Sequence, residues 1–127
     1  MKALEKTRAF TLIEVLVSLA IVGTILAIAA PRYFSNVDKT KEVVLRENLY
    51  VLRDALDKFY SDQNRYPAAL EDLVTQKYLR NIPIDPFTQS VNSWIPVPPT
   101  DAAMGGVYDV KSSAPNKARD GSWFKDW

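Results

Sequence analysis

The chain has 127 residues, of which 47% are hydrophobic and 24% are charged, and its formal net charge is +1. Because it contains neither cysteine nor histidine, disulfide bonds, thiol catalysis, Cys/His zinc sites and histidine-based triads are excluded. Its basic residues are mixed with acidic ones, so the sequence offers no basic patch for a nucleic acid.

A long apolar run covers residues 10–30, and its only ionisable side chain is Glu14. As a helix rising about 1.5 Å per residue, this run is long enough to cross a hydrocarbon core about 30 Å thick. An acidic side chain at the centre of such a helix costs about 2.5–3.5 kcal/mol, and less near an end. Glu14 therefore either has a functional partner or is a tolerated charge near the interface, and the run alone leaves both interpretations open.

Basic residues precede the run: Lys2, Lys6 and Arg8 are opposed only by Glu5. Positive flanks stay in the cytoplasm, so the amino end is expected there and everything after Pro31 is expected across the membrane. A cleaved signal peptide is the alternative, and three alanines near the end of the run imitate its cleavage site: Ala27, Ala29 and Ala30. That alternative fits poorly, because the apolar core of a signal peptide is usually shorter.

The segment Ala9-Phe10-Thr11-Leu12-Ile13-Glu14-Val15 resembles the processing site of type IV pilins and type II secretion pseudopilins. The resemblance implies that residues 1–9 are a leader, which prepilin peptidase removes by cutting between Ala9 and Phe10. It also implies that the new amino group is methylated, which gives N-methylphenylalanine at Phe10. The family usually has Gly before the cut, but Ala9 keeps a small side chain, so cleavage is still expected.

Cleavage before Phe10 would place an α-amino group at the edge of the membrane, near Glu14. In a filament, the amino group of one subunit can meet Glu14 of its neighbour, and a single buried polar contact can specify alignment. We therefore predict that Phe10 and Glu14 align incoming subunits. Gly23 and Pro31 fall where pilin helices commonly carry Gly and Pro, and the resemblance implies that the helix softens between them on assembly.

After Pro31 the pattern becomes that of an amphipathic helix. Apolar residues recur at three- and four-residue spacing: Val44, Leu45, Leu49, Leu52, Leu56 and Phe59. The charged residues between them are expected to form an ordinary solvent face: Arg46, Glu47, Arg53, Asp54, Asp57 and Lys58. The two halves predict a continuous helix from about Thr11 to Gln63, kinked or loosened around Pro31.

The segment Asn64-Arg65-Tyr66-Pro67 ends the long helix, because the residue before a proline is pushed out of the α region. A short helix with an apolar face over residues 69–74 is predicted to follow. The run from Lys77 to Phe87 then resembles the major pseudopilin of type II secretion, in which a Tyr-Leu/Ile-Arg stretch leads into a Pro-x-Asp-Pro-aromatic turn. This run and the lack of cysteine favour a pseudopilin over a pilus-forming pilin.

The last forty or so residues predict short strands at 94–97, 107–110 and 122–124, with Gly105-Gly106 as a turn before the second. Prolines at 96, 98 and 99 suit the first strand to the edge of a small antiparallel sheet. Four aromatic residues are expected to cover the seam between this sheet and the helix: Trp94, Tyr108, Trp123 and Trp127.

Five residues near the end of the chain offer oxygen atoms: Asp109, Ser112, Asn116, Asp120 and Asp126. Major pseudopilins hold a calcium ion in this loop, so the resemblance implies one here. Calcium needs six to eight oxygen ligands, however, and Lys117 and Arg119 are unfavourable neighbours for a dication. Two alternatives remain: a weak calcium site, with Asp120 as the first side-chain ligand and Asn116 the next, or a loop that Asp120 closes with Arg119, Lys117 or the Gly121 turn. No other cofactor is expected.

Together, the residues and the resemblance predict the α+β, type IV pilin-like fold, in which residues 10–30 form a transmembrane and filament-core helix and residues 31–127 form a periplasmic domain. The implied function is that of a structural pseudopilin of a type II secretion system, without enzymatic activity. It would polymerise from the bacterial inner membrane into a periplasmic filament that promotes export of folded proteins. The expected partners are copies of itself, minor pseudopilins, prepilin peptidase and the inner-membrane assembly platform. A type IV pilin for adhesion, motility or DNA uptake is the alternative, and a membrane-anchored binding module or enzyme is a third class.

Overall fold

The structure is a computed structural model that describes residues 9–127. Residues 1–8, which hold most of the predicted leader, lie outside the described residues. The described chain forms two compact units, one ending at Val37 and the other spanning Asp38–Trp127. The helix α1 (Leu12–Gln63) contributes residues to both units.

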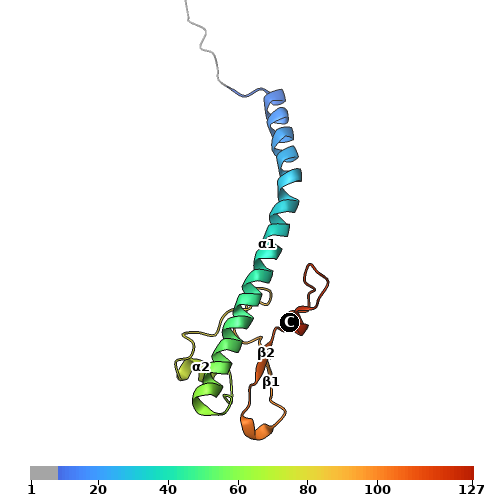
Figure 1. The fold of residues 1–127 in the computed structure, drawn as a ribbon. Helices are drawn as coiled ribbons and strands as arrows, with labels where there is room; N and C mark the ends of the chain where they lie inside the picture. Colours follow the sequence, from blue (N-terminus) through green and yellow to red (C-terminus); the bar gives the residue numbers. More distant parts are fainter. Residues whose placement is uncertain (1–8) are drawn as a thin grey trace, which may run out of the picture. The chain divides into compact units, whose positions relative to one another are not determined.

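The first unit is the apolar part of α1 (Figure 1). Thr11 and Glu14 close a reciprocal cap at its start: the Thr11 amide donates to Glu14 Oε2 and the Glu14 amide donates to Thr11 Oγ1, both at 3.3 Å. These bonds satisfy two backbone donors that a helix start leaves without partners. Pro31 lies inside α1 without ending it, which agrees with the predicted continuity of the helix.

In the second unit, one face of α1 carries the hydrophobic core, as the spacing predicts. Val44 is the exception, because it is 40% exposed, so its assignment to the buried face is wrong. Side chains from the rest of the unit complete the core. Its buried members are Leu45, Leu49, Leu52, Ala55, Leu56, Phe59, Leu70, Leu73, Trp94, Val107, Val110, Ala114, Ala118 and Phe124.

A turn after α1 leads into the short helix α2 (Glu71–Thr75). Asn64 has φ of 54°, a left-handed conformation that ends the helix. The Tyr66 amide donates to the carbonyl of Met104 at 2.6 Å, so residues 104–107 lie against this turn. Gly105 makes this approach possible, since a Cβ there would lie 2.2 Å from the Tyr66 carbonyl oxygen.

Two strands form an antiparallel sheet, β1 (Ile95–Val97) and β2 (Asp109–Lys111), with Ile95 opposite Lys111. The 3₁₀ helix η1 (Ala102–Met104) lies between them. The first two predicted strands are thus present, the second shifted by about two residues. The third, at 122–124, is wrong: Trp123 makes one isolated bridge to Lys117, and the 3₁₀ helix η2 (Phe124–Asp126) begins at the next residue.

The aromatic residues divide into two groups. Trp94 is 5% exposed, and its indole N–H donates to the Pro83 carbonyl at 2.8 Å, as expected of a core tryptophan. Tyr108 is 52% exposed and Trp123 is 40% exposed, so their predicted place in the core is wrong. Phe124, which the sequence analysis did not single out, stacks on Phe87 in the core with ring centroids 4.2 Å apart.

Candidate functional site

The amino-terminal part of α1 exposes its apolar side chains. Phe10 is 83% exposed, and no residue of the most apolar 18-residue window of α1 is buried. By length and composition this helix is able to cross a membrane, although a signal sequence would pass the same test. The first unit therefore presents an apolar surface that its own described residues do not cover.

Glu14 lies in the first turn of this helix, where its carboxylate accepts the Thr11 amide. This contact gives Glu14 a local structural role that the sequence analysis did not consider, although the Thr-x-x-Glu spacing signals a capping box. A capping carboxylate keeps acceptor capacity for a further donor. Processing between Ala9 and Phe10, the pairing of Glu14 with another copy and softening between Gly23 and Pro31 stay predictions.

Three of the five suggested calcium ligands have side chains bound to other protein groups, and Asp109 and Ser112 are the first two. Asp109 Oδ1 accepts from Arg53 Nε at 2.8 Å. The Ser112 hydroxyl donates to Asp85 Oδ2 at 2.5 Å, and both residues are fully buried. The second oxygen of Asp85 accepts the amides of Phe87 and Thr88, so this carboxylate closes the turn that follows Pro83.

Asp120 closes its own loop. Its Oδ1 accepts from the Ser122 amide at 2.9 Å and from the Ser122 hydroxyl at 2.6 Å. These bonds favour the ionised form and hold the pKa of Asp120 below its usual value. The backbone carbonyl of Asn116 accepts the Phe124 amide, and that of Ala118 accepts the Gly121 amide. Asp120 thus closes the loop, but its partner is Ser122 and not one of the three that were predicted, Arg119, Lys117 or the Gly121 turn.

The oxygen atoms of this region do not fit a calcium site. Within residues 9–127, no three Asp, Glu, His or Cys side chains converge in a way that could hold a metal ion. The backbone amide of Arg119 is held at 2.7 Å by Glu42, which fixes the loop to α1. Calcium would have to displace these bonds to collect six to eight ligands.

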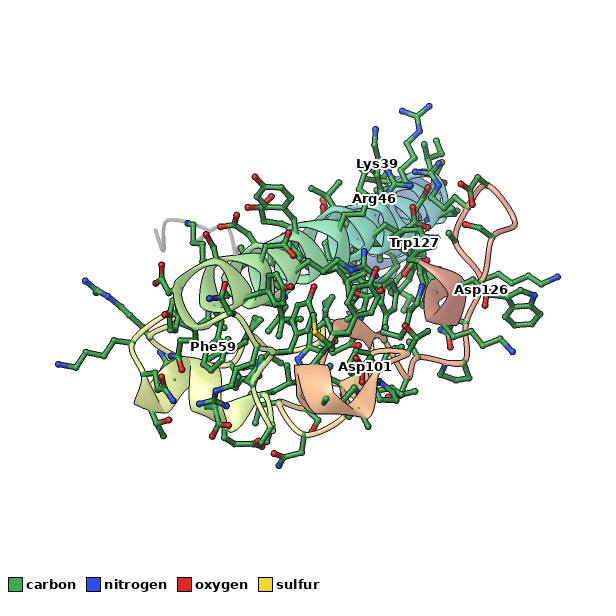
Figure 2. The ribbon with its side chains drawn as sticks, turned by 60° about the horizontal axis from the view of Figure 1, so that its bottom comes forward. Lys39, Arg46, Phe59, Asp101, Asp126 and Trp127 are labelled. Atoms are coloured by element: carbon green, nitrogen blue, oxygen red, sulfur yellow. The ribbon has the colours of Figure 1, made fainter. Side chains whose placement is uncertain are left out.

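The end of the chain is held by arginines from α1, as Figure 2 shows around Arg46 and Trp127. Arg53 Nη2 donates to the carbonyls of Trp127 at 2.6 Å and Val110 at 3.1 Å. The Arg46 guanidinium lies 4.5 Å from the centre of the Trp127 ring, and the Trp127 indole N–H donates to Ser122 Oγ at 2.7 Å. Arg53 was assigned to the solvent face, which is wrong. Its position four residues after Leu49 and three before Leu56, beside the apolar face, is the signal that could have found it.

Comparison with known proteins gives two kinds of match. The model of the prokaryotic N-terminal methylation motif matches residues 5–30. The type II secretion system core protein G of Escherichia coli K12 is 28% identical to this chain over 91% of the chain and 87% of the relative. The protein of that name from Pseudomonas aeruginosa is 28% identical over 90% of the chain and 93% of the relative.

A shorter match is to the type IV major pilin protein PilA of Myxococcus xanthus. It is 36% identical, but the match covers 48% of the chain and 28% of the relative. No solved structure matches. The similarity to core protein G therefore includes the second unit, whereas the similarity to the pilin extends over about half of the chain.

Proposed function

We propose that this type IV pilin-like chain, which is similar to the core protein G of type II secretion systems, is a pseudopilin that polymerises into a filament and promotes protein export. The observation that carries the proposal is the extent of the similarity, about nine-tenths of both this chain and its relatives. The methylation motif does not separate a pseudopilin from a pilin, because pilins share it. The match to the pilin relative, however, covers only about half of the chain.

The exposed helix supports a two-state mechanism. In the membrane, lipid covers the apolar side chains of residues 10–28. In a filament, these side chains pack instead against the corresponding side chains of neighbouring copies. Cleavage between Ala9 and Phe10 frees an amino group that pairs with Glu14 of a neighbouring copy. That pairing relieves the desolvation of both charges and sets the register between subunits.

The chain acts as a structural subunit, and its work is assembly. It is a single-pass protein whose amino end faces the cytoplasm and whose second unit faces the periplasm, as the positive-inside tendency predicts. Other pseudopilins, prepilin peptidase and an inner-membrane platform are the partners that this role requires. The energy for extraction comes from another protein, because this sequence has no phosphate-binding loop.

Deleting the chain from its cell tests the proposal. The expected result is that exported proteins accumulate in the periplasm while surface pili and motility stay normal. Intact secretion with lost pili or motility would instead assign the chain to a type IV pilus, the second candidate, which the match to the Myxococcus xanthus pilin favours. Mass spectrometry of the purified chain tests processing, and a methylated Phe10 at the amino end is the expected product.

A further inference from the structure

We propose that the two ends of the second unit bind each other in neighbouring copies of this chain, through a basic surface at one end and an acidic surface at the other. This inference rests on the proposed function, because it concerns copies within a filament. The basic surface consists of Lys39, Lys117, Arg119 and Lys125 with the exposed Trp123. The acidic surface consists of Asp57, Asp62, Glu71 and Asp101.

The basic surface lies where the C-terminal segment meets the beginning of this unit's part of α1. Glu42 holds the Arg119 amide, and Arg46 holds the Trp127 ring, so the loop and the helix are fixed together here. Figure 2 shows Lys39, Arg46 and Trp127 grouped at one end of this unit. Seven basic residues of this end outnumber four acidic ones: Lys39, Lys41, Arg46, Lys111, Lys117, Arg119 and Lys125 against Asp38, Glu42, Asp120 and Asp126.

The acidic surface lies at the other end, where α1 finishes and α2 and η1 follow (Figure 1). Asp62 accepts from the Tyr78 hydroxyl at 2.7 Å, which fixes the segment after α2 to the end of α1. The Asp101 side chain caps η1. Six acidic residues here outnumber four basic ones: Asp54, Asp57, Asp62, Glu71, Asp72 and Asp101 against Lys58, Arg65, Lys77 and Arg80. Of these cations, Lys58 is already paired with Asp54 at 2.9 Å.

The two surfaces are too far apart to neutralise each other within one copy. From Lys39 to Asp62 the helix rises about 35 Å at about 1.5 Å per residue. The screening length at physiological ionic strength is only about 8 Å. The two surfaces therefore do not pair within one copy, and a second copy offers each of them a surface with the opposite excess of charge.

The basic surface is also held ready for binding. Two ammonium groups lie near the Trp123 ring, Lys117 Nζ at 4.7 Å and Lys125 Nζ at 5.4 Å from its centre. Asp120 and Ser122 tighten the loop that carries them. Fixing these long side chains in advance lowers the entropy that binding would otherwise cost.

A contact between two different ends of one molecule is heterologous. Such contacts do not close a symmetric dimer, and they build open filaments when the rotation does not close. A unit with a basic end and an acidic end can therefore add copies one after another, as a filament subunit must. The same contact would orient every copy in one direction.

Disulfide crosslinking in cells tests this contact. Because the sequence contains no cysteine, only the introduced cysteines can form disulfide bonds. Asn116→Cys on the basic end and Ala102→Cys beside Asp101 both change exposed residues. With both cysteines in one full-length chain, oxidation is expected to give a ladder of multimers. Each single-cysteine chain is expected to stay mainly monomeric, since a heterologous contact does not bring identical residues together.

Charge-reversal variants of the same double-cysteine chain provide a second test of the contact. Lys117→Glu with Lys125→Glu, or Asp57→Lys with Asp62→Lys, should each reduce the ladder by about tenfold. All four changes in one chain restore opposite signs across the contact, so the ladder should return. The matched control, Lys77→Glu with Arg80→Glu, makes the same change in charge at the acidic end, where it adds to the sign already there, and should not reduce the ladder.

The outcomes separate this inference from the proposed function. Filaments and secretion with no ladder, or reversals without effect and without rescue, would overturn the contact and leave the pseudopilin role standing. A chain that forms no filament and supports no secretion would overturn the proposed function itself. Binding of the full chain to phosphatidylglycerol vesicles that is lost on Lys117→Glu with Lys125→Glu, with no ladder in cells, would assign the basic surface to lipid and contradict the inference.

Discussion

The two units of this chain bury their apolar residues in different ways. The second unit covers its leucines and Phe59 with its own sheet, loops and α2, whereas the first leaves residues such as Leu16, Ile21 and Leu26 exposed. Leaving such an apolar surface in water is unfavourable by about 25 cal/mol per Å². The second unit therefore covers its own core, and under the proposed function a membrane or other copies cover the apolar side chains of the first.

The largest expected effect is on the first unit. Glu14→Ala should abolish filament assembly while the chain still inserts into the membrane, because the amino group of the next copy loses its partner. Counting filaments by electron microscopy and measuring secretion would show this. Because Glu14 also caps α1, the control is Thr11→Ala, which removes the bond from the Glu14 amide to Thr11 Oγ1 at a cost of about 1 kcal/mol and should keep assembly. If both variants lost assembly to the same extent, the role of Glu14 would be that of a helix cap and not of a partner for the next copy.

A substitution in the hydrophobic core should affect the second unit and leave the first unchanged. Phe59→Ala removes a fully buried ring and should lower the stability of the second unit by about 3–5 kcal/mol, without preventing membrane insertion. Denaturant unfolding of the full chain in detergent, followed by tryptophan fluorescence, measures this. Tyr50→Ala, at an exposed position of α1, is the matched control and should change stability by less than about 0.5 kcal/mol. Similar losses in both variants would contradict the assignment of the core.

Arg53 should have the next largest effect. Arg53→Met keeps the aliphatic stem but removes the bonds to Asp109, Val110 and Trp127, and charged hydrogen bonds of this kind contribute about 1.5–3 kcal/mol. Trypsin should then cleave the C-terminal segment faster, as mass spectrometry of the fragments would show. Lys58→Met, which breaks only the exposed pair with Asp54, should cost less than about 1 kcal/mol. An unchanged cleavage rate in the Arg53 variant would show that Arg53 does not hold the end of the chain.

Arg53 also shows how far sequence reasoning reaches. Helical spacing gave α1 nearly to the residue, and the residue before Pro67 marked its end, since both depend on neighbours in the sequence. Arg53 was missed because its partners Asp109 and Trp127 are 56 and 74 residues away. The strand at 122–124 failed for a different reason: Trp123 makes a single bridge to the nearby Lys117, and η2 begins at the next residue. What depends on pairs distant in sequence was not visible in local patterns.

The smallest expected effect concerns calcium, and it tests whether a bound ion stabilises the second unit. Saturating calcium at 100 times its dissociation constant would stabilise a binding protein by about 2.7 kcal/mol, which is several degrees in melting temperature for a unit of this size. We expect no shift between millimolar calcium and a chelator, because Asp120 is held by Ser122, Asp109 by Arg53 and Ser112 by Asp85. A shift of several degrees that Asp120→Asn removes would instead establish a calcium site. The second unit would then, like the first, be completed from outside its own chain.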